Sequence, residues 1–476
     1  NPHRARAFAN AARVVEKIEA DLQAMISSGE ILQLKGIGKG TAAVLEVLAA
    51  GCKPDVLQQL EADIPEGVRD MLGISGLGPK KVRSLWQELG AETLGELEYA
   101  CRENRLVELA GFGAATQQRV LDGIQFARRA AERRLLNEAD AEASALAEQL
   151  EAAAAVERVV VAGEVRRRCE TVAVLDLVVV AGDTEAAAEV CASVLAEQEQ
   201  LPDGRWRGVT EGGHAARLTI AEPTAAGAAL LWATGSDEHL ESLASRASSQ
   251  GLRLSAGGLF RDRRLVAAAD EQELYGALGC RWMAPELREL AEDVDRAAAD
   301  SLPELVGSED LRGALHNHTT ASDGLATVDE MAEAAGALGW SFIGIAEHSP
   351  VATYANGVDV DRLRDQWRQI DAINDRGGVR VVKGLEADIL TDGDLDIPEG
   401  CEDGLEYVVA SVHSAFRLER ERQTERIMTA VAHPACRVLG HPTGRLLLAR
   451  PGYELDLERV LEACAAHDVA VEINAS

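Results

Sequence analysis

The sequence lacks several features that would place it in common classes of protein. No apolar run reaches about 18 residues, which excludes a transmembrane helix, and no signal peptide is visible. The eight cysteines are scattered without a C-x-x-C pair, so we expect a reduced, cytoplasmic protein. The chain also has no excess of positive charge. Its net charge of −31 argues against a surface that binds nucleic acid everywhere, but the first 135 residues are nearly balanced, so such a partner is expected there.

The organisation of the chain predicts a multidomain protein of α and α/β domains. At 476 residues it is long enough for several domains. It begins without Met inside a predicted helix and stops just after an apolar run, "VAVEINAS", so we expect truncation at both ends. Helical periodicity dominates the first part, a small α/β unit and a helical unit follow, and strand-like runs then alternate with helices, as in a (β/α) barrel. We therefore expect domains at 1–60, 61–138, 139–225, 226–290 and 311–476, with an acidic linker at 291–310.

A short glycine motif occurs three times in the non-acidic part, as "LKGIGKGTA" (34–42), "ISGLGPKKV" (74–82) and "LAGFGAATQQRV" (109–120). Each Gly-x-Gly precedes a predicted helix, whose bare N–H groups can bind phosphate. The glycines would also suit a tight turn between helices, and the third copy lacks a lysine. The copies resemble helix-hairpin-helix motifs, which hold a nucleic-acid backbone without reading bases. The expected DNA contacts are Gly36, Gly38, Lys39, Gly76, Gly78, Lys80, Lys81, Gly111 and Gly113.

Five of the ten histidines, together with two acids, stand at the ends of the C-terminal strand-like runs. The carboxyl ends of parallel strands meet at one mouth of a barrel, and two of the histidines are two residues apart on one predicted strand and so share a face. Imidazole and carboxylate groups gathered in this way can bind Zn²⁺, Mn²⁺ or Fe, and two or three such ions can clamp a phosphate and activate a water. The expected ligands are His316, His318, Asp323, His348, Glu386, His413 and His441.

The runs "LHNHTTASDG", "AEHS", "GLEADI", "SVHS" and "GHPTGR" resemble the motifs of the PHP (polymerase and histidinol phosphatase) domain. The resemblance implies a trinuclear phosphoesterase site with the seven ligands above, of which His316, His318, Glu386 and His413 act in catalysis through the bound metals. It implies Mn²⁺ as the metal, with Zn²⁺ or Fe as alternatives. Glu347 departs from the Asp that usually precedes the motif histidine. The final Asp-x-His of the family does not occur before the chain ends, so we expect incomplete metal loading of this fragment.

The whole order of segments resembles the bacterial and archaeal family X DNA polymerases that carry 3′-5′ exonuclease activity. The runs "NPHRARAFANAAR", "ALLWATGSDEH" and "ELYGALGCRWMAPELRE" strengthen this resemblance. It implies a helical N-terminal domain, a fingers-like domain at 61–138, a palm-like domain at 139–225 and a thumb-like domain at 226–290.

The palm-like segment departs from the polymerase pattern at the positions that carry the chemistry. Nucleotidyl transfer with two metals needs three carboxylates, two of them one residue apart on a strand. By resemblance these positions hold Val174, Asp176 and Arg217, and the phosphate-binding Ser of the preceding turn is Glu164. The rest of the degenerate polymerase site comprises Arg166, Arg167, Gly235 and Ser236.

One carboxylate cannot hold two Mg²⁺ ions, so we do not expect Mg²⁺ at the palm and we expect polymerase activity to be lost or severely reduced. A register error would move Arg217, whereas Val174 and Glu164 do not depend on its alignment. Because a buried carboxylate needs a partner, we predict that Asp176 and Arg217 pair across adjacent strands, within about 6 Å.

These features together predict a DNA-repair enzyme whose PHP domain removes nucleotides in the 3′→5′ direction and incises abasic sites. The expected partner is DNA with a gap, a nick or a 3′ end, bound by a monomer associated with the nucleoid. Two alternatives stay open, an active gap-filling polymerase and a non-catalytic scaffold that binds DNA ends. A small phosphomonoester is a further alternative substrate, but it would leave the glycine motifs without a purpose.

Overall fold

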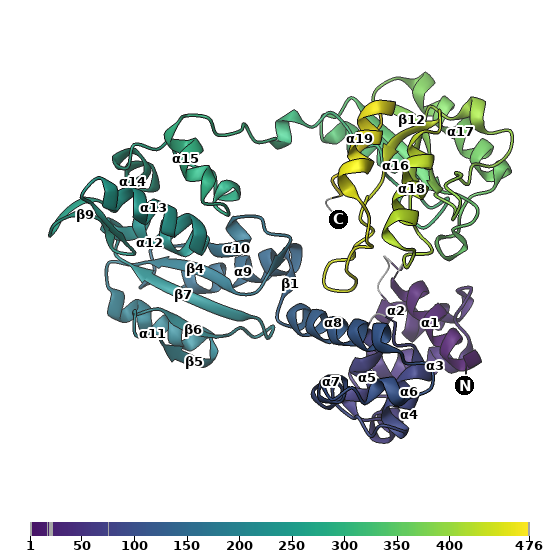
Figure 1. Ribbon diagram of the computed structural model, residues 1–476, viewed down its shortest axis with the longest axis horizontal. Helices are drawn as coiled ribbons and strands as arrows, with labels where there is room; N and C mark the ends of the chain where they lie inside the picture. Colours follow the sequence, from purple (N-terminus) through teal and green to yellow (C-terminus); the bar gives the residue numbers. More distant parts are fainter. Residues whose placement is uncertain (1, 17, 19–21, 75, 475–476) are drawn as a thin grey trace. The chain divides into compact units, whose positions relative to one another are not determined.

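The computed structural model describes residues 2–16, 18, 22–74 and 76–474, so Ser75 of the second glycine motif lies outside the described residues. The chain divides into two compact units, one formed by residues 1–121, 308–445 and 452–476, the other by 122–307 and 446–451 (Figure 1). All eight cysteines are free. Among the described helices, none has the length and apolar character needed to cross a membrane.

The described residues between 2 and 131 form short helices joined by turns, as their periodicity predicts. The helices are α1 (Pro2–Glu16), α2 (Leu22–Ser28), α3 (Lys39–Ala49), α4 (Asp55–Asp63), α5 (Glu66–Asp70), α6 (Pro79–Gln87), α7 (Leu94–Arg102) and α8 (Ala114–Ala131). Amphipathic spacing turns one face of several helices inward, so that Leu85, Leu97 and Ile124 are fully buried.

The three glycine motifs adopt one shared local structure. A short 3₁₀ turn, η1 (Glu30–Gln33), η2 (Met71–Gly73) or η3 (Leu106–Glu108), precedes each of them. The first glycine then takes a positive φ, +107° at Gly36, +92° at Gly76 and +87° at Gly111. Residues with a Cβ rarely adopt this conformation, which explains why the motif requires glycine there. The helices α3, α6 and α8 begin directly afterwards, in the hairpin arrangement that the sequence predicts.

The segment 139–225 folds around a five-stranded sheet in the order β2-β4-β7-β6-β5. Its strands are β2 (Arg158–Val161), β4 (Leu175–Val180), β5 (Ala196–Gln200), β6 (Trp206–Val209) and β7 (Ala215–Ala221), and only β4 and β7 run parallel. The helices are α9 (Leu136–Glu151), α10 (Gly163–Arg166) and α11 (Thr184–Val194), and β1 (Arg134–Leu135) pairs with β3 (Thr171–Val172). Every residue of β4 is buried, so this strand is the centre of the core.

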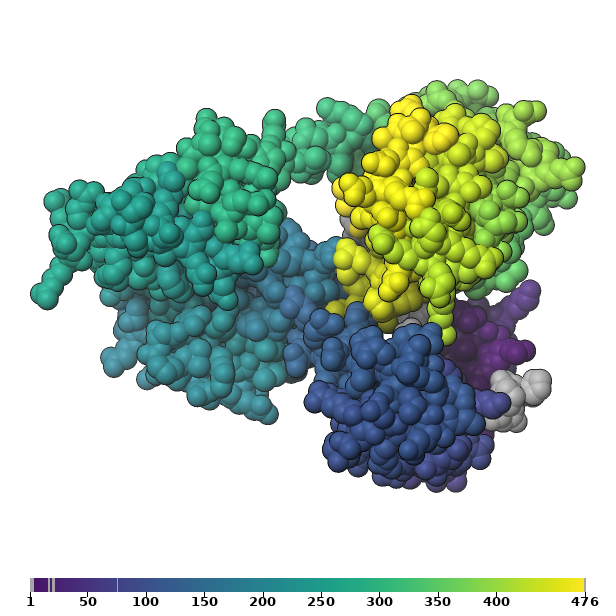
Figure 2. Space-filling model, viewed as in Figure 1, coloured from purple at the N-terminus to yellow at the C-terminus, as the bar shows by residue number. Residues whose placement is uncertain are grey.

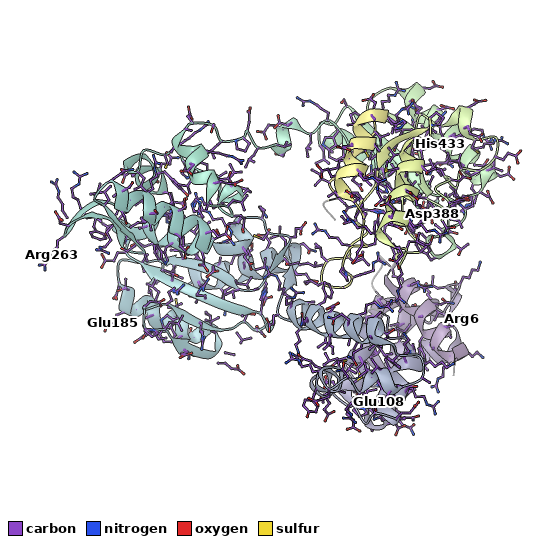
Figure 3. All side chains as sticks on the ribbon, in the orientation of Figure 1. Arg6, Glu108, Glu185, Arg263, Asp388 and His433 are labelled. Carbon is purple, nitrogen blue, oxygen red and sulfur yellow. The ribbon has the colours of Figure 1, made fainter. Side chains whose placement is uncertain are left out.

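The following segment is mainly helical and carries a small three-stranded antiparallel sheet. Its elements are α12 (Ala226–Thr234), α13 (Asp237–Ser249), β8 (Arg253–Ser255), β9 (Gly258–Arg261), β10 (Arg264–Ala267), α14 (Glu271–Ala277) and α15 (Glu292–Ala298). The β9–β10 hairpin stands out from the surface in Figure 2, with Arg263 at its tip in Figure 3. The expected linker 291–310 is corrected in part. Its acidic start forms α15, because Val294 and Ala297 lie three apart and bury themselves in the helical core.

The C-terminal segment contains a five-stranded parallel sheet in chain order, which the alternation of strands and helices predicts. Its strands are β11 (Phe342–His348), β12 (Arg380–Asp388), β13 (Tyr407–Ser411), β14 (Cys436–Leu439) and β15 (Ala470–Val471), and its helices are α16 (Val328–Ala337), α17 (Val360–Arg376), α18 (Arg420–Val431) and α19 (Leu457–His467). β11 and β15 form the edges of this sheet.

The strand expected at "GALHNH" does not form, and this expectation is corrected. Residues 312–317 run beside β11 without forming a regular strand. The backbone N–H groups of Gly344 and Ala346 donate to Ala314 and Asn317 at 2.7 and 2.8 Å. The Asn317 side chain donates to the Gly344 carbonyl at 2.9 Å, in place of a backbone partner. Because a side chain replaces a backbone donor here, the ladder of backbone hydrogen bonds with β11 is interrupted while the segment stays extended.

Candidate metal centre

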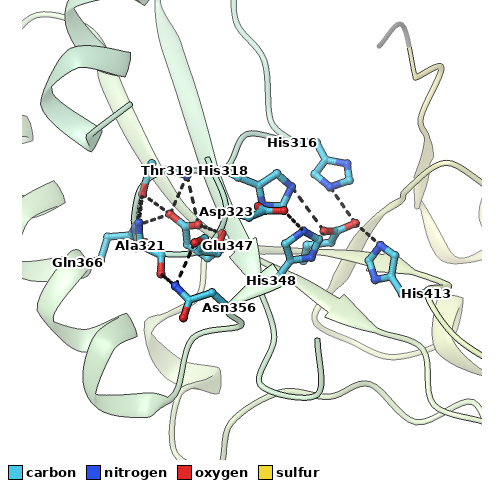
Figure 4. A network of polar contacts seen from close by, with 12 residues as sticks. His316, His318, Thr319, Ala321, Asp323, Glu347, His348, Asn356, Gln366 and His413 are labelled. Atoms are coloured by element: carbon cyan, nitrogen blue, oxygen red, sulfur yellow. Dashed lines mark hydrogen bonds and ion pairs between the residues drawn. The ribbon is translucent and has the colours of Figure 1, made fainter. Parts of the chain in front are cut away.

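The seven predicted ligands come together at the carboxyl ends of the parallel strands. His348 is the last residue of β11, and Glu386 lies two residues before the end of β12. His413 and His441 each follow the end of their strand, β13 or β14, by two residues. The remaining three, His316, His318 and Asp323, come from the extended segment beside β11 and the loop after it (Figure 4). The structure therefore brings these seven side chains together at one edge of the sheet.

Glu386 is the hub of the cluster and is 1% exposed. Its carboxylate lies 3.0 Å from His316 Nε2, 3.2 Å from His413 Nε2, 3.1 Å from His441 Nε2, 2.8 Å from His348 Nδ1 and 3.5 Å from His318 Nε2. Burial alone would raise the pKa of Glu386, but the hydrogen bonds from the surrounding histidines hold it well below its usual range. The hub is therefore an ionised carboxylate, the state in which it can bind a cation.

Two further carboxylates, which sequence reasoning missed, contact the Nδ1 atoms of two of the histidines. Nδ1 of His316 lies 2.8 Å from Glu472, and Nδ1 of His413 lies 2.7 Å from Asp388. Such a contact fixes the tautomer with the proton on Nδ1 and leaves Nε2 for a metal. Burial lowers the pKa of His316, but Glu386 and Glu472 outweigh it and raise the pKa to about 9. The sequence could have revealed Asp388, because its spacing of two residues places it on the same face of β12 as Glu386. For Glu472 the only signal in the sequence was its position directly after β15.

The donor set fits divalent metal ions. Three overlapping groups each bring their ligand atoms within 4.8 Å of one another: His316, Glu386 and His441; His318, Asp323 and His348; and His348, Glu386 and His413. Nδ1 of His348 and Oε2 of Glu386 lie 2.8 Å apart but outside hydrogen-bonding geometry, so both buried atoms lack a hydrogen bond. Burial lowers the pKa of His318, which favours the neutral imidazole that metals require. Imidazole and carboxylate groups gathered in this way are the chemistry of a transition-metal site.

Glu347, the departure from the expected Asp, points away from the cluster and organises the loop that supplies Asp323. Its fully buried carboxylate accepts hydrogen bonds from the Thr319 N–H at 3.2 Å and from Gln366 Nε2 at 2.6 Å. The hydroxyl of Thr319 also donates to it (Figure 4), as does the hydroxyl of Ser322. Because each donor comes from the loop or from α17, Glu347 fixes the position of the loop.

In the palm-like segment the structure confirms the predicted pair between Asp176 and Arg217. The two residues are register partners on the parallel strands β4 and β7. Nε and Nη2 of Arg217 donate to the two carboxylate oxygens of Asp176 at 2.5 and 2.9 Å. Burial raises the pKa of Asp176, although the hydrogen bonds and the charge of Arg217 act in the opposite direction, and the same contact raises the pKa of Arg217. The single carboxylate at this position is thus already neutralised within the protein.

Val174 was expected on the same strand as Asp176, and this expectation is corrected. Val174 lies in the bend directly before β4, which begins at Leu175. The cause is Glu164, whose carboxylate accepts the Ala173 N–H at 2.7 Å and so holds this stretch against α10. Glu164 also pairs with Arg133 at 2.6 Å. Its charge is therefore balanced internally.

The other residues of the degenerate polymerase site make internal contacts as well. Arg166 forms a bidentate pair with Glu271 at 2.9 and 2.8 Å, and Arg167 pairs with Glu289 and donates to the Thr234 carbonyl. Gly235 directly follows the end of α12 as its C-cap, and the Ser236 hydroxyl caps α13 by accepting the His239 N–H. The arginines that would bind a phosphate are thus engaged by carboxylates.

Comparison with protein families identifies three parts of the chain. Residues 314–476 match the PHP domain, 229–289 match the DNA polymerase beta thumb, and 68–125 match a SAM-like helix-hairpin-helix tandem. The tandem covers the second and third glycine motifs, and the first motif lies outside it.

Comparison with individual proteins extends the similarity to the whole chain. A protein of Bacillus subtilis (strain 168), "DNA polymerase/3'-5' exonuclease PolX", is 32% identical over 490 residues, covering 100% of this chain and 84% of that protein. A probable phosphatase of Caldanaerobacter subterraneus subsp. tengcongensis is 32% identical over 166 residues, covering 34% of this chain and 61% of the phosphatase. A structure of Leishmania infantum polymerase beta covers 47% of this chain and 98% of its own at 16% identity, and its TM-score of 0.31 is too low to support an argument.

Proposed function

This chain belongs to the family X DNA polymerases that carry a PHP domain, and from that premise we propose that its PHP domain is a metal-dependent 3′-5′ exonuclease acting on DNA. The observation that carries the proposal is the convergence of five histidines on the buried carboxylate of Glu386. Phosphodiester hydrolysis is the chemistry that such a cluster of metal ligands supports best.

Two or three ions would be held by His316, His318, Asp323, His348, Glu386, His413 and His441. We propose Mn²⁺, with Zn²⁺ or Fe as alternatives, because imidazole and carboxylate ligands suit all three. When bound, such ions lower the pKa of water and offset the charge of the reacting phosphate.

The residues around the ligands hold them in the binding state. Asp388 and Glu472 accept the Nδ1 protons of His413 and His316, which leaves each Nε2 facing Glu386. Glu347 keeps the loop of Asp323 in place through its four donors. The protein thus contributes a pre-oriented, largely buried set of ligands to the reaction.

The helix-hairpin-helix domains imply binding to DNA. We propose that the backbone is held at Gly36, Gly38, Lys39, Gly76, Gly78, Lys80, Lys81, Gly111 and Gly113. The proposed substrates are gapped or nicked duplexes and 3′ ends, bound by a monomer. This part of the proposal rests on the positive-φ turns and on the helix starts directly after them.

We further propose that the palm-like domain does not transfer nucleotides. The only carboxylate at its predicted metal position, Asp176, is paired with Arg217, and Arg166 and Arg167 are paired with Glu271 and Glu289. These contacts occupy the carboxylate and the two arginines that a nucleoside triphosphate with Mg²⁺ would use at this place.

The test is an end-labelled gapped duplex incubated with the purified protein and Mn²⁺, with and without deoxynucleotides. Shortening that requires His316, shown by its loss in His316→Ala, is the expected result. Primer extension would support the alternative of an active gap-filling polymerase and overturn the proposal for the palm. Tight binding to DNA ends without either product would favour the scaffold and overturn the exonuclease.

A further inference from the structure

Tyr354 exposes an aromatic ring directly beside the histidine cluster. It lies in η7 (Thr353–Ala355), within the loop that follows His348, and it is 61% exposed. The centre of its ring lies 6.1 Å from the ring of His348 and 6.1 Å from that of His413, with interplanar angles of 61° and 71°. Both histidines therefore meet the tyrosine ring edge to face, and much of the ring surface remains open to solvent.

The loop around Tyr354 is held by specific contacts. The Val358 N–H donates to the His348 carbonyl and the Val351 N–H donates to Asp396, both at 2.8 Å. Asn356 takes a positive φ of +58° and donates from its side chain to the Ser322 carbonyl at 3.0 Å. Gly357 approaches Ser349 so closely that a Cβ would lie 2.0 Å from its carbonyl oxygen. An exposed ring on a fixed loop is ready to receive a ligand without a further ordering cost.

We propose that Tyr354 stacks on the terminal nucleobase of a DNA 3′ end whose phosphodiester lies at the histidine cluster. This inference rests on the proposed function and specifies its substrate, a 3′-terminal nucleotide with an intact base. A nucleobase offers a flat π-face whichever base it is, so the contact suits an enzyme that removes nucleotides in any sequence. Stacking of this kind contributes about 1–3 kcal/mol per base, which corresponds to roughly 5- to 150-fold in affinity.

The test compares two oligonucleotides that differ only at the 3′ end, one ending in thymidine and the other in an abasic tetrahydrofuran residue. Their kcat/KM ratio with the wild-type protein and Mn²⁺ defines the preference for a base. Tyr354→Ala should reduce this preference about tenfold or more, while Tyr354→Phe, which keeps the ring without the hydroxyl, should retain most of it. Val351→Ala, in the same loop and also exposed, is the matched control and should show the wild-type ratio.

Two results would overturn the stacking role. If Tyr354→Ala slows both oligonucleotides equally, the residue supports the loop and not the base. If Tyr354→Phe loses as much preference as Tyr354→Ala, the hydroxyl and not the ring makes the contact.

A binding measurement separates this inference from the proposed function. An oligonucleotide with 2-aminopurine at its 3′ end is bound in EDTA, where no hydrolysis occurs. Stacking quenches its fluorescence, so wild-type protein should quench it and Tyr354→Ala should not. That difference would support stacking even if the protein shortened no substrate, and equal quenching by both proteins would overturn it.

Discussion

Asp176 and Arg217 face one another across the parallel strands β4 and β7, with both carboxylate oxygens of the aspartate accepting from the guanidinium. Two-metal nucleotidyl transfer needs carboxylates at this position that are free to bind metal ions. The guanidinium of Arg217 instead engages the carboxylate of Asp176. Because Asp176 is 5% exposed, the arginine is also what makes its charge tolerable in the core.

Removal of Arg217 alone should destabilise its unit. Arg217→Ala leaves the buried Asp176 charge without a partner and should lower the free energy of unfolding by about 3 kcal/mol. The double variant Asp176→Leu/Arg217→Met removes both charges and should recover most of that loss. Urea unfolding followed by hydrogen exchange in β4 and β7 measures both. Equal destabilisation by the single and double variants would show that packing, and not charge pairing, is what the arginine supplies.

Asp388 and Glu472 should tune metal affinity although neither belongs to the proposed ligands. Asp388→Asn and Glu472→Gln each remove the acceptor behind a histidine and should weaken Mn²⁺ binding about 10- to 100-fold. Titration of free Mn²⁺ by electron paramagnetic resonance gives this affinity independently of activity. Asp392→Asn, an exposed position in the turn after β12, is the control and should bind as the wild type does. Wild-type affinity in both of the first two variants would contradict the positioning role.

The lysines of the glycine motifs should differ in their contribution to DNA binding. Lys39 and Lys80 are exposed at the starts of α3 and α6, whereas Lys81 lies with its Nζ 5.5 Å from the centre of the Phe112 ring. Lys39→Ala and Lys80→Ala should each weaken binding and reduce the slope of log affinity against log salt by about 1. The slope is obtained from DNA affinities measured by fluorescence anisotropy at salt concentrations from about 50 to about 200 mM.

The control for the salt slope is Lys53→Ala, because Lys53 pairs with Glu61 away from the glycine motifs. It should leave the slope unchanged. If Lys53→Ala and Lys80→Ala reduced the slope equally, the motifs would have no special place in the interface.

His239 should make the second unit sensitive to mild acid. Burial lowers its pKa to about 3, with the nearby Arg288 and Arg167 acting in the same direction. The folded protein therefore keeps this imidazole neutral, while the unfolded chain takes up a proton below about pH 6.5. The free energy of unfolding should thus fall as the pH drops from about 6.5 towards 3, by up to about 1.4 kcal/mol per pH unit.

His239→Gln should flatten this dependence, because glutamine does not titrate. Hydrogen exchange along a urea titration at pH 7 and pH 5 reports α13 and α14 separately from the rest of the chain. The control is His467→Gln at an exposed position in α19, which should keep the wild-type slope. A slope in His239→Gln as steep as in the wild type would assign the acid sensitivity to another group.

The predictable part of the site was the part that short spacing encodes. His316 and His318, the glycines with positive φ and the pairing of Asp176 with Arg217 all follow from local patterns or from strand register. The regular strand expected at 313–318 did not form, because the Asn317 side chain takes the place of a backbone donor. The placement of Val174 failed for a similar reason, since the Glu164 side chain binds the Ala173 N–H.

The sequence by itself determined which chemical groups this protein offers, because ligand type and motif spacing are properties of short stretches of chain. Only the tertiary structure decided which carboxylates pair with the histidines and arginines of these sites. Glu472 reaches His316 across 156 positions, and Glu271 and Glu289 engage arginines more than 100 positions away. Such contacts depend on how distant strands and helices pack against one another, and no local period records that packing.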